Sequence, residues 1–241
     1  MIVGLLHPGE MGSAIGAALQ TVGHDVVWAS AGRSDATRRR AAAFRDAGSM
    51  EAVAREAQIV LSICPPHAAL DVARAVPGDA LYVDANAISP AHAREIAALK
   101  PQFVDGGIVG GPPRAAGETR LYLSGNRAID VAALFEGSIV ETRIVPDASA
   151  VKMTYAAWSK GTAAMLLAIR DVARHYGVEE DLEAEWRDSV PTLPERLAAA
   201  ERSAAKKGWR WVGEMEEIAD TFAAAGHPEG FHRAAAEVFR S

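Results

Sequence analysis

The sequence predicts an α/β fold, with a doubly wound parallel sheet followed by an all-α C-terminal domain. Two observations carry this prediction. Short apolar runs alternate with helical patterns over residues 1–147, and this alternation is typical of a parallel sheet covered by helices. From residue 148 onward the apolar residues recur at helical spacing and no run has the pattern of a strand. We therefore expect one domain at 1–147 and a helical domain at 148–241.

Each element of the first domain follows from a local pattern. Apolar runs bounded by turn residues predict the strands, and segments with apolar residues at helical spacing predict the helices between them. Ser89 precedes one of these helices and is a suitable N-cap. The expected strands cover residues 2–6, 22–30, 58–64, 80–84, 103–105, 120–123 and 139–144. The first helix is expected to begin at residue 13, and three further helices are expected at 35–47, 67–75 and 90–99.

One long helix dominates the second domain. Residues 148–176 contain no proline and a single glycine, Gly161, and would extend about 43 Å if fully helical. Because residues 163–169 are apolar on every side, we expect the helix to be buried all round. The further helical runs at 194–207, 212–225 and 230–240 are too few to cover it. We therefore expect a homodimer that forms through the C-terminal helices.

Composition and charge exclude several classes of protein. The net charge of -6 and the pI near 5.7 argue against nucleic acid or an anionic membrane as a partner. No apolar stretch approaches the roughly 18 residues of a membrane span, and a strand at residue 2 leaves no room for a signal peptide. Cys64 is the single cysteine, and His227 and His232 have poor metal-site spacing. We expect a cytoplasmic protein without a disulfide or a metal site.

The turn between the first strand and the first helix has the pattern of a phosphate-binding site. In a strand–glycine turn–helix context, backbone amides and the positive end of the helix dipole bind a pyrophosphate. One glycine would let the backbone approach the phosphates, and another would let the helix pack close to the strand. This pattern predicts a Rossmann-type dinucleotide site, although a histidine replaces the first glycine of G-x-G-x-x-G. The residues assigned to it are His7, Pro8, Gly9, Glu10, Met11 and Gly12.

The end of the second strand indicates which dinucleotide binds. NAD enzymes carry an Asp or Glu there, which binds the adenosine ribose, whereas this chain has no carboxylate until Asp35. It has Ser30, Arg33 and Ser34 instead, and a guanidinium binds phosphate oxygens bidentately. We expect NADP(H) rather than NAD(H), with these three residues near the 2′-phosphate.

Four separated motifs resemble those of the β-hydroxyacid dehydrogenases, which include 3-hydroxyisobutyrate and 6-phosphogluconate dehydrogenases. The segments 4–12 (GLLHPGEMG) and 84–90 (DANAISP) are similar to the family's cofactor turn and its D-x-S-T-x-S-P segment. The segments 105–111 (DGGIVGG) and 149–152 (SAVK) are similar to its substrate motif and to the segment with its catalytic lysine. The C-terminal helices resemble a branch of this superfamily that has its own helical domain.

The resemblance implies further cofactor and catalytic residues. The loop Cys64-Pro65-Pro66 would form a wall beside the cofactor, and Asn86 resembles the family position near the nicotinamide ribose. Lys152 falls where the family has its catalytic lysine. The helix dipole and apolar neighbours should lower the pKa of its ammonium group. Lys152 could then act as general acid and base during hydride transfer.

The residues that usually hold the family's substrate differ here. Val109 stands in place of a serine, and Ala156 stands in place of an asparagine. Two glycines would let a substrate carboxylate or carbonyl approach backbone amides, and two polar side chains share the helix face of Lys152 at i+3 and i+7. These substrate candidates are Gly110, Gly111, Tyr155 and Ser159.

We therefore expect an NADP(H)-dependent oxidoreductase that transfers hydride between nicotinamide and a small hydroxy acid or a related carbonyl or alcohol. Two alternatives stay open. An imine reductase shares the architecture and a similar Asp-Gly-x-Ile pattern at residues 105–108, although such enzymes typically lack the lysine. A non-catalytic NADPH-binding or sensor protein would explain the changes at Val109 and Ala156.

Overall fold

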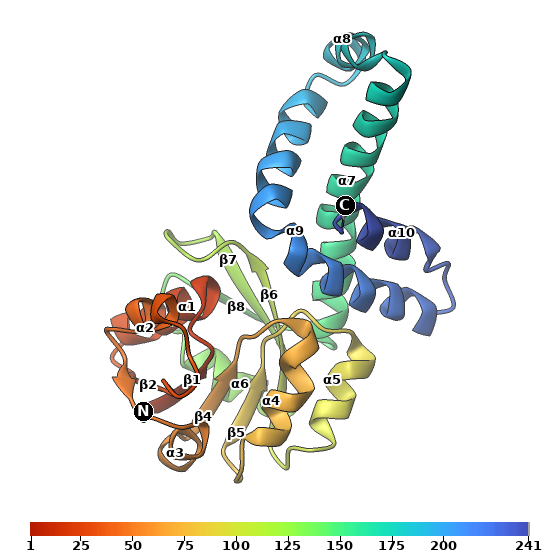
Figure 1. Cartoon of the computed structure of the whole chain (residues 1–241). Coiled ribbons are helices and arrows are strands. Elements are labelled where there is room, and N and C mark those ends of the chain that lie inside the picture. The colour runs from red at the N-terminus through yellow and green to blue at the C-terminus, as the bar shows by residue number, and fades with distance from the viewer. Residues whose placement is uncertain (241) are drawn as a thin grey trace. The chain divides into compact units, whose positions relative to one another are not determined.

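The computed structural model describes residues 1–240, which divide into two compact units, Met1–Lys152 and a second unit that begins at Met153. The first unit contains the sheet, and the second consists of helices (Figure 1). The boundary lies within a single continuous helix, α7 (Ala148–Tyr176). The boundary expected from the sequence, after Asp147, lies just before this helix begins.

Within residues 1–240 the first unit forms one eight-stranded sheet in the order β3-β2-β1-β4-β5-β6-β7-β8. Strands β1 to β6 are mutually parallel, whereas β7 is antiparallel to β6 and parallel to β8. The segment between β6 and β7 is too short to hold a crossover helix, and such a connection reverses the chain. The predicted doubly wound fold is confirmed, with a sheet that is mostly parallel. The strands are β1 (Ile2–Leu6), β2 (Asp25–Trp28), β3 (Arg45–Asp46), β4 (Ile59–Ser62), β5 (Leu81–Asp84), β6 (Phe103–Gly110), β7 (Thr119–Ser124) and β8 (Glu141–Ile144).

Helices cover both faces of this sheet. One core cluster packs α1 (Glu10–Thr21) and α6 (Ala128–Ala133) against alternate residues of the central strands. The other packs α3 (Met50–Glu56), α4 (Ala69–Ala75) and α5 (Pro90–Ala97) against the opposite face. The central strands are therefore buried on both sides, which explains their continuous apolar runs.

The helix caps and helix ends of this unit agree only in part with the sequence predictions. Ser89 does cap α5, because its hydroxyl accepts a hydrogen bond from the amide of His92 at 3.3 Å. The helix expected at 35–47 is wrong beyond residue 40: α2 (Asp35–Arg40) ends there and the chain enters β3. The segment after α2 buries Phe44 in the core, so tertiary packing ends the helix. The short helices α3 and α6 were not expected from the sequence.

The second unit contains the rest of α7 followed by α8 (Glu179–Ser189), α9 (Leu193–Ala224) and α10 (Gly230–Val238). The 32 residues of α9 are one helix where the sequence predicted two runs, because Gly208 and Gly213 are accommodated within it. Helix α8 was not expected. No helix within residues 1–240 has the length and apolar character needed to cross a membrane.

The side chains of α7 do not match the expectation of burial all round. Leu166 and Leu167 are buried, but Met165 is 45% exposed and Ile169 is 40% exposed. Within the described chain, one side of the helix is therefore covered and another is open. An all-apolar segment predicts burial on every side only if enough partner surface exists, and the sequence pattern alone does not reveal that.

Candidate functional site

The sequence-predicted cofactor residues lie at the carboxyl ends of neighbouring parallel strands. The glycine turn follows β1, Ser30 and Arg33 follow β2, Cys64 follows β4, and Asn86 follows β5. Strand β1 lies between β2 and β4, so the chain order reverses beside it. In open α/β sheets, ligands bind in the crevice at such a switch point.

The two glycines of the turn have different constraints. Gly9 immediately precedes α1, and within residues 1–240 no side chain caps this helix start. A Cβ atom on Gly9 would meet only the carbonyl oxygen of His7, at 4.0 Å, whereas a Cβ on Gly12 would lie 2.7 Å from that same oxygen. Gly12 is therefore required by the protein itself. Gly9 leaves open space at a helix N-terminus, which suits an anionic group.

The other residues of the turn support its backbone. Pro8 is buried, and Met11 packs against the core cluster beneath the sheet. Glu10 is the first residue of α1. The hydroxyl of Ser13 donates back to the carbonyl oxygen of Gly9 at 2.6 Å, so it does not cap the helix. These residues contribute to the site chiefly by holding the backbone of the glycine turn in place.

His7 has the left-handed backbone conformation, with a φ of 63°, that a glycine would adopt more easily. Its Nδ1 atom is buried and has no hydrogen-bond partner among the described residues. Burial, and to a smaller extent the positive charge of Arg33, lowers the pKa of His7 to about 4. The imidazole is therefore neutral near pH 7 and can accept or donate one hydrogen bond at this position.

Arg33 is the second residue of this region with an unsatisfied polar group. Its Nε atom is buried without a partner in the part of the chain that the structure describes, and burial lowers the pKa of its guanidinium. Buried polar groups are normally hydrogen-bonded. Two such unsatisfied atoms, on His7 and Arg33, beside an open glycine turn fit a polar ligand such as a dinucleotide.

The sequence did not reveal a carboxylate beside the end of β2. Asp46, at the end of β3, accepts hydrogen bonds from the amides of Ser30 at 3.2 Å and Gly48 at 2.8 Å. Arg38 donates to the carbonyl oxygen of Ser30 at 2.9 Å. The hydroxyl of Ser34 caps α2 through the amide of Thr37. The β2–β3 pairing alone brings Asp46 here, and its hydrogen bonds to amides hold the loop that carries Ser30.

Asn86 joins the loops after β4 and β5. Its Oδ1 accepts a hydrogen bond from the amide of Cys64 at 2.5 Å, and its Nδ2 donates to Ser62 at 3.2 Å and to Asp84 at 2.8 Å. Asn86 is only 2% exposed, and its side chain is engaged in these hydrogen bonds within the protein. Within the chain Asn86 positions the Cys64–Pro66 loop, and its place near the nicotinamide ribose stays a prediction.

Burial disfavours the charged forms of the ionisable groups around Asn86. Burial raises the pKa of Asp84 to about 7, although hydrogen bonds from Asn86 oppose this rise. Burial likewise raises the pKa of the Cys64 thiol to about 12. Pro65 precedes a short 3-10 turn, η1 (Pro66–Ala68), and Pro66 is buried. The Cys64-Pro65-Pro66 loop is therefore uncharged near neutral pH, and its two prolines restrict the backbone.

A buried carboxylate holds the start of α7 on the sheet. Asp105 of β6 accepts hydrogen bonds from the hydroxyl of Ser149 at 2.6 Å, from its amide at 2.8 Å and from the hydroxyl of Ser124 at 3.0 Å. The absence of a side chain at Gly107 permits the close approach, because a Cβ there would lie 2.7 Å from the carbonyl oxygen of Ala148. The Asp-Gly-Gly pattern is thus explained by helix docking.

This docking places Lys152 against β6. A Cβ on Gly107 would lie 2.9 Å from the Cβ of Lys152, and the Nζ of Lys152 donates to the carbonyl oxygen of Ile108 at 2.7 Å. The side chain is partly buried rather than extended into solvent. The first unit therefore holds this amine in a defined position on the strand that carries the Asp-Gly-Gly motif.

The four substrate candidates differ in how tightly the protein packs around them. A Cβ on Gly110, whose φ is 111°, would lie 2.1 Å from the carbonyl oxygen of Glu118, so packing between strands requires this glycine. Gly111 has no atom within 4 Å of such a Cβ in the described chain. In the helical unit, Tyr155 is 49% exposed, and the Ser159 hydroxyl is 3.5 Å from the carbonyl oxygen of Ala156.

The polar residues lost from the family pattern are replaced by buried apolar ones. Val109 is 5% exposed and Ala156 is fully buried, so both pack in the interior of their units. Lys160 of α7 forms an ion pair with Glu214 of α9 at 2.6 Å. This pair ties two helices of the second unit together.

The sequence of residues 2–134 matches the family described as the NAD binding domain of 6-phosphogluconate dehydrogenase. Residues 173–241 match a domain of unknown function, DUF1932. No curated protein matches the chain.

Solved structures share the whole fold. A conserved protein of unknown function, itself described as structurally similar to 3-hydroxyacid dehydrogenases, is 28% identical with a TM-score of 0.73, over 100% of this chain and 96% of that one. The 3-hydroxyisobutyrate dehydrogenase of Salmonella typhimurium is 18% identical with a TM-score of 0.74, over 100% of this chain and 93% of that one. A reductive aminase from Aspergillus terreus, in complex with NADPH, is 15% identical with a TM-score of 0.62, over 99% and 92% of the two chains.

The match to the N-terminal family agrees with the geometry described above. Both the glycine turn after β1 and the unsatisfied atoms of His7 and Arg33 lie within the matched residues. The first unit is a pyridine-nucleotide-binding domain.

Proposed function

We propose a hydride-transfer reaction for this chain, which belongs to the family of the NAD binding domain of 6-phosphogluconate dehydrogenase. The hydride would pass between NADP(H) and a small hydroxy acid or a related carbonyl or alcohol. Membership of this family makes the chain a NAD(P)-dependent oxidoreductase. The observation that carries the finer proposal is the placement of Lys152, whose amine is held on β6 in the unit that binds the nucleotide.

In this proposal each part of the first unit has a separate task. The open helix start after Gly9 binds the pyrophosphate, and His7 and Arg33 offer polar atoms to the same ligand. The loop held by Asn86 forms an uncharged wall. When bound, the nicotinamide gives or takes the hydride. Lys152 holds a proton at Nζ, and passes it to or accepts it from the substrate oxygen.

The direct test is an assay of NADPH oxidation over a panel of keto acids, semialdehydes and cyclic imines. We expect NADPH to bind and to be oxidised with keto acids or semialdehydes. Turnover restricted to cyclic imines would contradict the proposal and favour an imine reductase. NADPH binding without turnover on any member would favour a binding or sensor protein, for which the buried Val109 and Ala156 are the specific support.

The preference for NADP(H) is expected to depend on Arg33. Replacing it by glutamine removes a cation whose buried Nε has no partner among residues 1–240. Loss of a charge-assisted hydrogen bond costs roughly 1.5–3 kcal/mol, so we expect NADPH affinity to fall by about tenfold to a hundredfold and NADH affinity to change little. Titration calorimetry with both nucleotides measures the difference.

A matched control for this experiment is Arg39→Gln, at an exposed arginine of α2. We expect this variant to bind both nucleotides as the unmodified chain does. An unchanged NADPH/NADH ratio in Arg33→Gln, or an equal change in both variants, would show that Arg33 does not select the cofactor.

We also propose that a second copy of the chain covers the open side of α7. Met165, Ile169, Val172 and Tyr176 are 45%, 40%, 58% and 74% exposed and recur at i, i+4, i+7 and i+11. This is the seam spacing by which one helix packs against another. The four residues of this seam are uncharged. A two-fold axis would pack the seam against the same seam of a second copy, and two-fold dimers are the commonest homo-oligomers.

The oligomeric state in solution tests this surface. The chain has a mass of 25.4 kDa, and we expect sedimentation at micromolar concentration to give twice that mass. The double variant Ile169→Glu/Val172→Glu should be monomeric and folded, whereas Ile129→Glu, at an apolar residue of α6 that is 64% exposed, should remain dimeric. A monomeric unmodified chain would refute the proposed dimer.

A further inference from the structure

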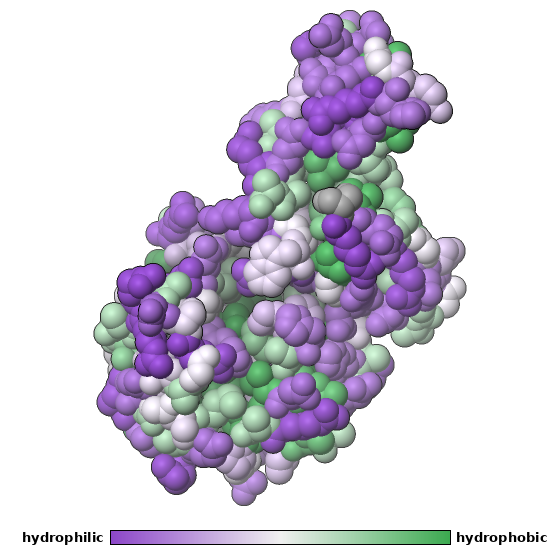
Figure 2. Space-filling model, viewed as in Figure 1, coloured by the Kyte–Doolittle hydropathy of each residue, from purple (hydrophilic) through white to green (hydrophobic). Residues whose placement is uncertain are grey.

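Two acidic side chains of the first unit are buried, and the proposed hydride transfer uses neither of them directly. Hydrophilic residues are spread over the visible face of the molecule (Figure 2), where water solvates their charges. Asp84, by contrast, is 0% exposed and Asp105 is 9% exposed. Their hydrogen-bond partners within residues 1–240 are all uncharged groups. An isolated charge is costly to bury, and a buried carboxyl group tends to hold a proton instead.

The two carboxyl groups lie on neighbouring strands of the sheet. Asp84 of β5 is in register with Asp105 of β6, and such strands lie about 4.8 Å apart. On either side, Ser62 of β4 is in register with Asp84, and Ser124 of β7 is in register with Asp105. These four residues form one polar row across the sheet. Two like charges in the middle of this row would repel each other, so one of the two groups is favoured to be neutral.

The hydrogen bonds indicate which group holds the charge. Asp105 accepts three, two from the hydroxyl and the amide of Ser149 and one from the hydroxyl of Ser124. Asp84 accepts two, from the amide of Asn86 at 3.0 Å and from its Nδ2 at 2.8 Å. Each hydrogen bond donated to a carboxylate favours its ionised form. Asp105, which has more donors and is less deeply buried, is therefore the better site for the negative charge.

The charges around Asp84 favour the same division. Burial raises the pKa of Asp84 to about 7, and the negative charge of Asp105 adds to this rise. The hydrogen bonds from Asn86 and the positive charge of His92, on α5, oppose it. The proton is therefore retained on Asp84 well above the pH at which an ordinary aspartate releases it.

Three further titratable groups face the pair, and within the described residues none of them supplies a positive charge. Burial raises the pKa of the Cys64 thiol to about 12 and also raises the pKa of the Tyr82 hydroxyl, so both are uncharged near neutral pH. Burial raises the pKa of Asp105 as well; the hydrogen bonds that it accepts oppose this rise, and the negative charge of Asp147 adds to it. A proton is thus the means by which the pair avoids a second buried charge.

The pair connects two parts of the candidate site. Asp84 holds Asn86, whose Oδ1 accepts a hydrogen bond from the amide of Cys64 at 2.5 Å, so Asp84 supports the loop after β4. Asp105 holds Ser149 in the first turn of α7. The two acidic residues therefore act on the loop beside the cofactor turn and on the helix that carries the amine.

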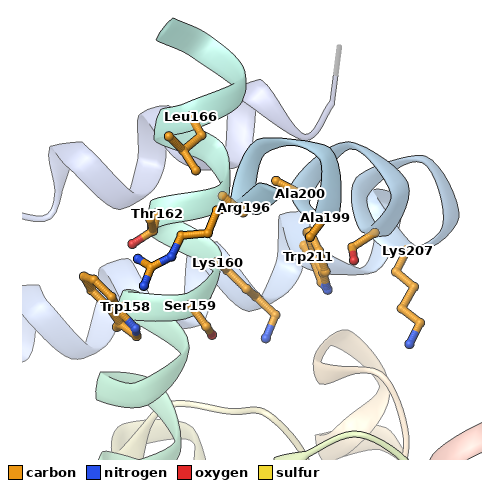
Figure 3. A pocket seen from close by; sticks show the side chains of 12 residues that line it. Trp158, Ser159, Lys160, Thr162, Leu166, Arg196, Ala199, Ala200, Lys207 and Trp211 are labelled. Carbon is orange, nitrogen blue, oxygen red and sulfur yellow. The ribbon is translucent and has the colours of Figure 1, made fainter. Parts of the chain in front are cut away.

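Helix α7 has a polar anchor in each unit. In the helical unit, Lys160 projects from α7 beside α9 (Figure 3) and pairs with Glu214 at 2.6 Å. In the first unit, the hydrogen bonds to Asp105 hold the helix start, three residues before Lys152. The placement of the Lys152 amine on β6 therefore depends on the acceptor oxygens of Asp105.

We propose that Asp84 and Asp105 share one proton and one negative charge up to neutral pH, and that this division positions both the loop after β4 and Lys152. The charge stays on Asp105, which holds α7, and the proton stays on Asp84. Both are positioning residues, because each acts through another residue. The effect on Lys152 rests on the proposed function, whereas the sharing of one proton does not.

Carbon-13 NMR of the full chain, labelled at the aspartate carboxyl carbon, tests the pair. We expect one carboxyl group to titrate near pH 7 and this titration to be absent from Asp84→Asn. In Asp105→Asn the same midpoint should fall by about one pH unit, because the neighbouring negative charge is removed. Asp79→Asn, at an exposed residue, is the matched control and should leave the midpoint unchanged. Titration of every aspartate below about pH 5, or an unchanged midpoint in Asp105→Asn, would overturn the pair.

Ser149→Ala provides a second variant in case Asp105→Asn does not fold, which circular dichroism would reveal. It keeps both carboxyl groups and removes the hydroxyl that donates to Asp105 at 2.6 Å. The ionised form of Asp105 then loses a hydrogen bond, so its midpoint should rise towards that of Asp84. Midpoints identical to those of the unmodified chain would refute the assignment of the charge to Asp105.

Kinetics separates positioning of the amine from support of the fold. Asp105→Asn should lower kcat by about tenfold to a hundredfold, because a small displacement of a reacting group is costly, and should leave NADPH affinity unchanged. In a chain that already carries Lys152→Met, the same substitution should lower kcat no further. An equal loss in both backgrounds would show that Asp105 does not act through Lys152.

Failure of this inference is distinguishable from failure of the proposed function. Lys152-dependent turnover without any carboxyl group that titrates near pH 7 would overturn only the pair. A carboxyl group that titrates near pH 7 and responds to Asp105→Asn would support the pair even in a chain that oxidises NADPH with no substrate of the panel.

Discussion

Replacing Lys152 by methionine is expected to lower NADPH-dependent turnover by about two to four orders of magnitude and to leave NADPH affinity unchanged. Methionine preserves most of the length and the apolar stem of the side chain, so packing against Gly107 is retained. It removes the amine that now donates to the carbonyl oxygen of Ile108 at 2.7 Å. Steady-state kinetics with the best substrate of the panel and titration of NADPH measure the two effects separately.

Lys152→Arg is the informative companion variant. It keeps a cation that can donate to Ile108, but a guanidinium does not release a proton near neutral pH. If Lys152 transfers a proton, the arginine variant should lose kcat almost as severely as the methionine variant. If the lysine only orients groups by its charge, arginine should restore activity. Near-normal turnover in the methionine variant would remove Lys152 from the mechanism.

Substitution of Gly9 by valine is expected to abolish cofactor binding without unfolding the chain. A Cβ at Gly9 meets only the carbonyl oxygen of His7, at 4.0 Å, and its backbone, with φ of -70°, suits any L-residue. The added side chain would, however, occupy the space over the start of α1. Loss of two charge-assisted hydrogen bonds corresponds to roughly 3–6 kcal/mol, so NADPH affinity should fall by at least about a hundredfold.

Gly12→Val provides the contrast for this prediction. Its Cβ would lie 2.7 Å from the carbonyl oxygen of His7, and forcing extra atoms into a packed site costs about 1–3 kcal/mol. The Gly12 variant should therefore melt at a lower temperature, whereas the Gly9 variant should melt near the temperature of the unmodified chain. Normal NADPH affinity in Gly9→Val would place the pyrophosphate somewhere other than the glycine turn.

Much of the site could be predicted because its signals are local in sequence. A strand, two glycines and the first turn of a helix lie within residues 2–15, so β1, the turn and α1 follow from short-range preferences. The same is true of the long helix that carries Lys152, which the structure has at Ala148–Tyr176. The sequence also revealed the NAD(P)-binding family through four motifs in order.

Other features depend on pairs of residues that are distant in sequence. Asp46 reaches Ser30 through the pairing of β2 and β3. Asn86, after β5, accepts a hydrogen bond from the amide of Cys64, after the neighbouring strand β4. No local pattern reports these contacts, because they follow from the order of strands in the sheet. The same holds for the shortened α2, which ends where Phe44 enters the core.

The sequence by itself determined the fold class, the glycine turn and the presence of a lysine at the start of the long helix. Only the tertiary structure decided which of the predicted polar groups are free to meet a ligand and which are occupied by the protein. His7 and Arg33 keep unsatisfied atoms within residues 1–240, whereas Asn86 and Ser34 are engaged within the chain. The physical reason is that each hydrogen-bonding group is satisfied by its neighbours in space, and those neighbours are set by long-range packing.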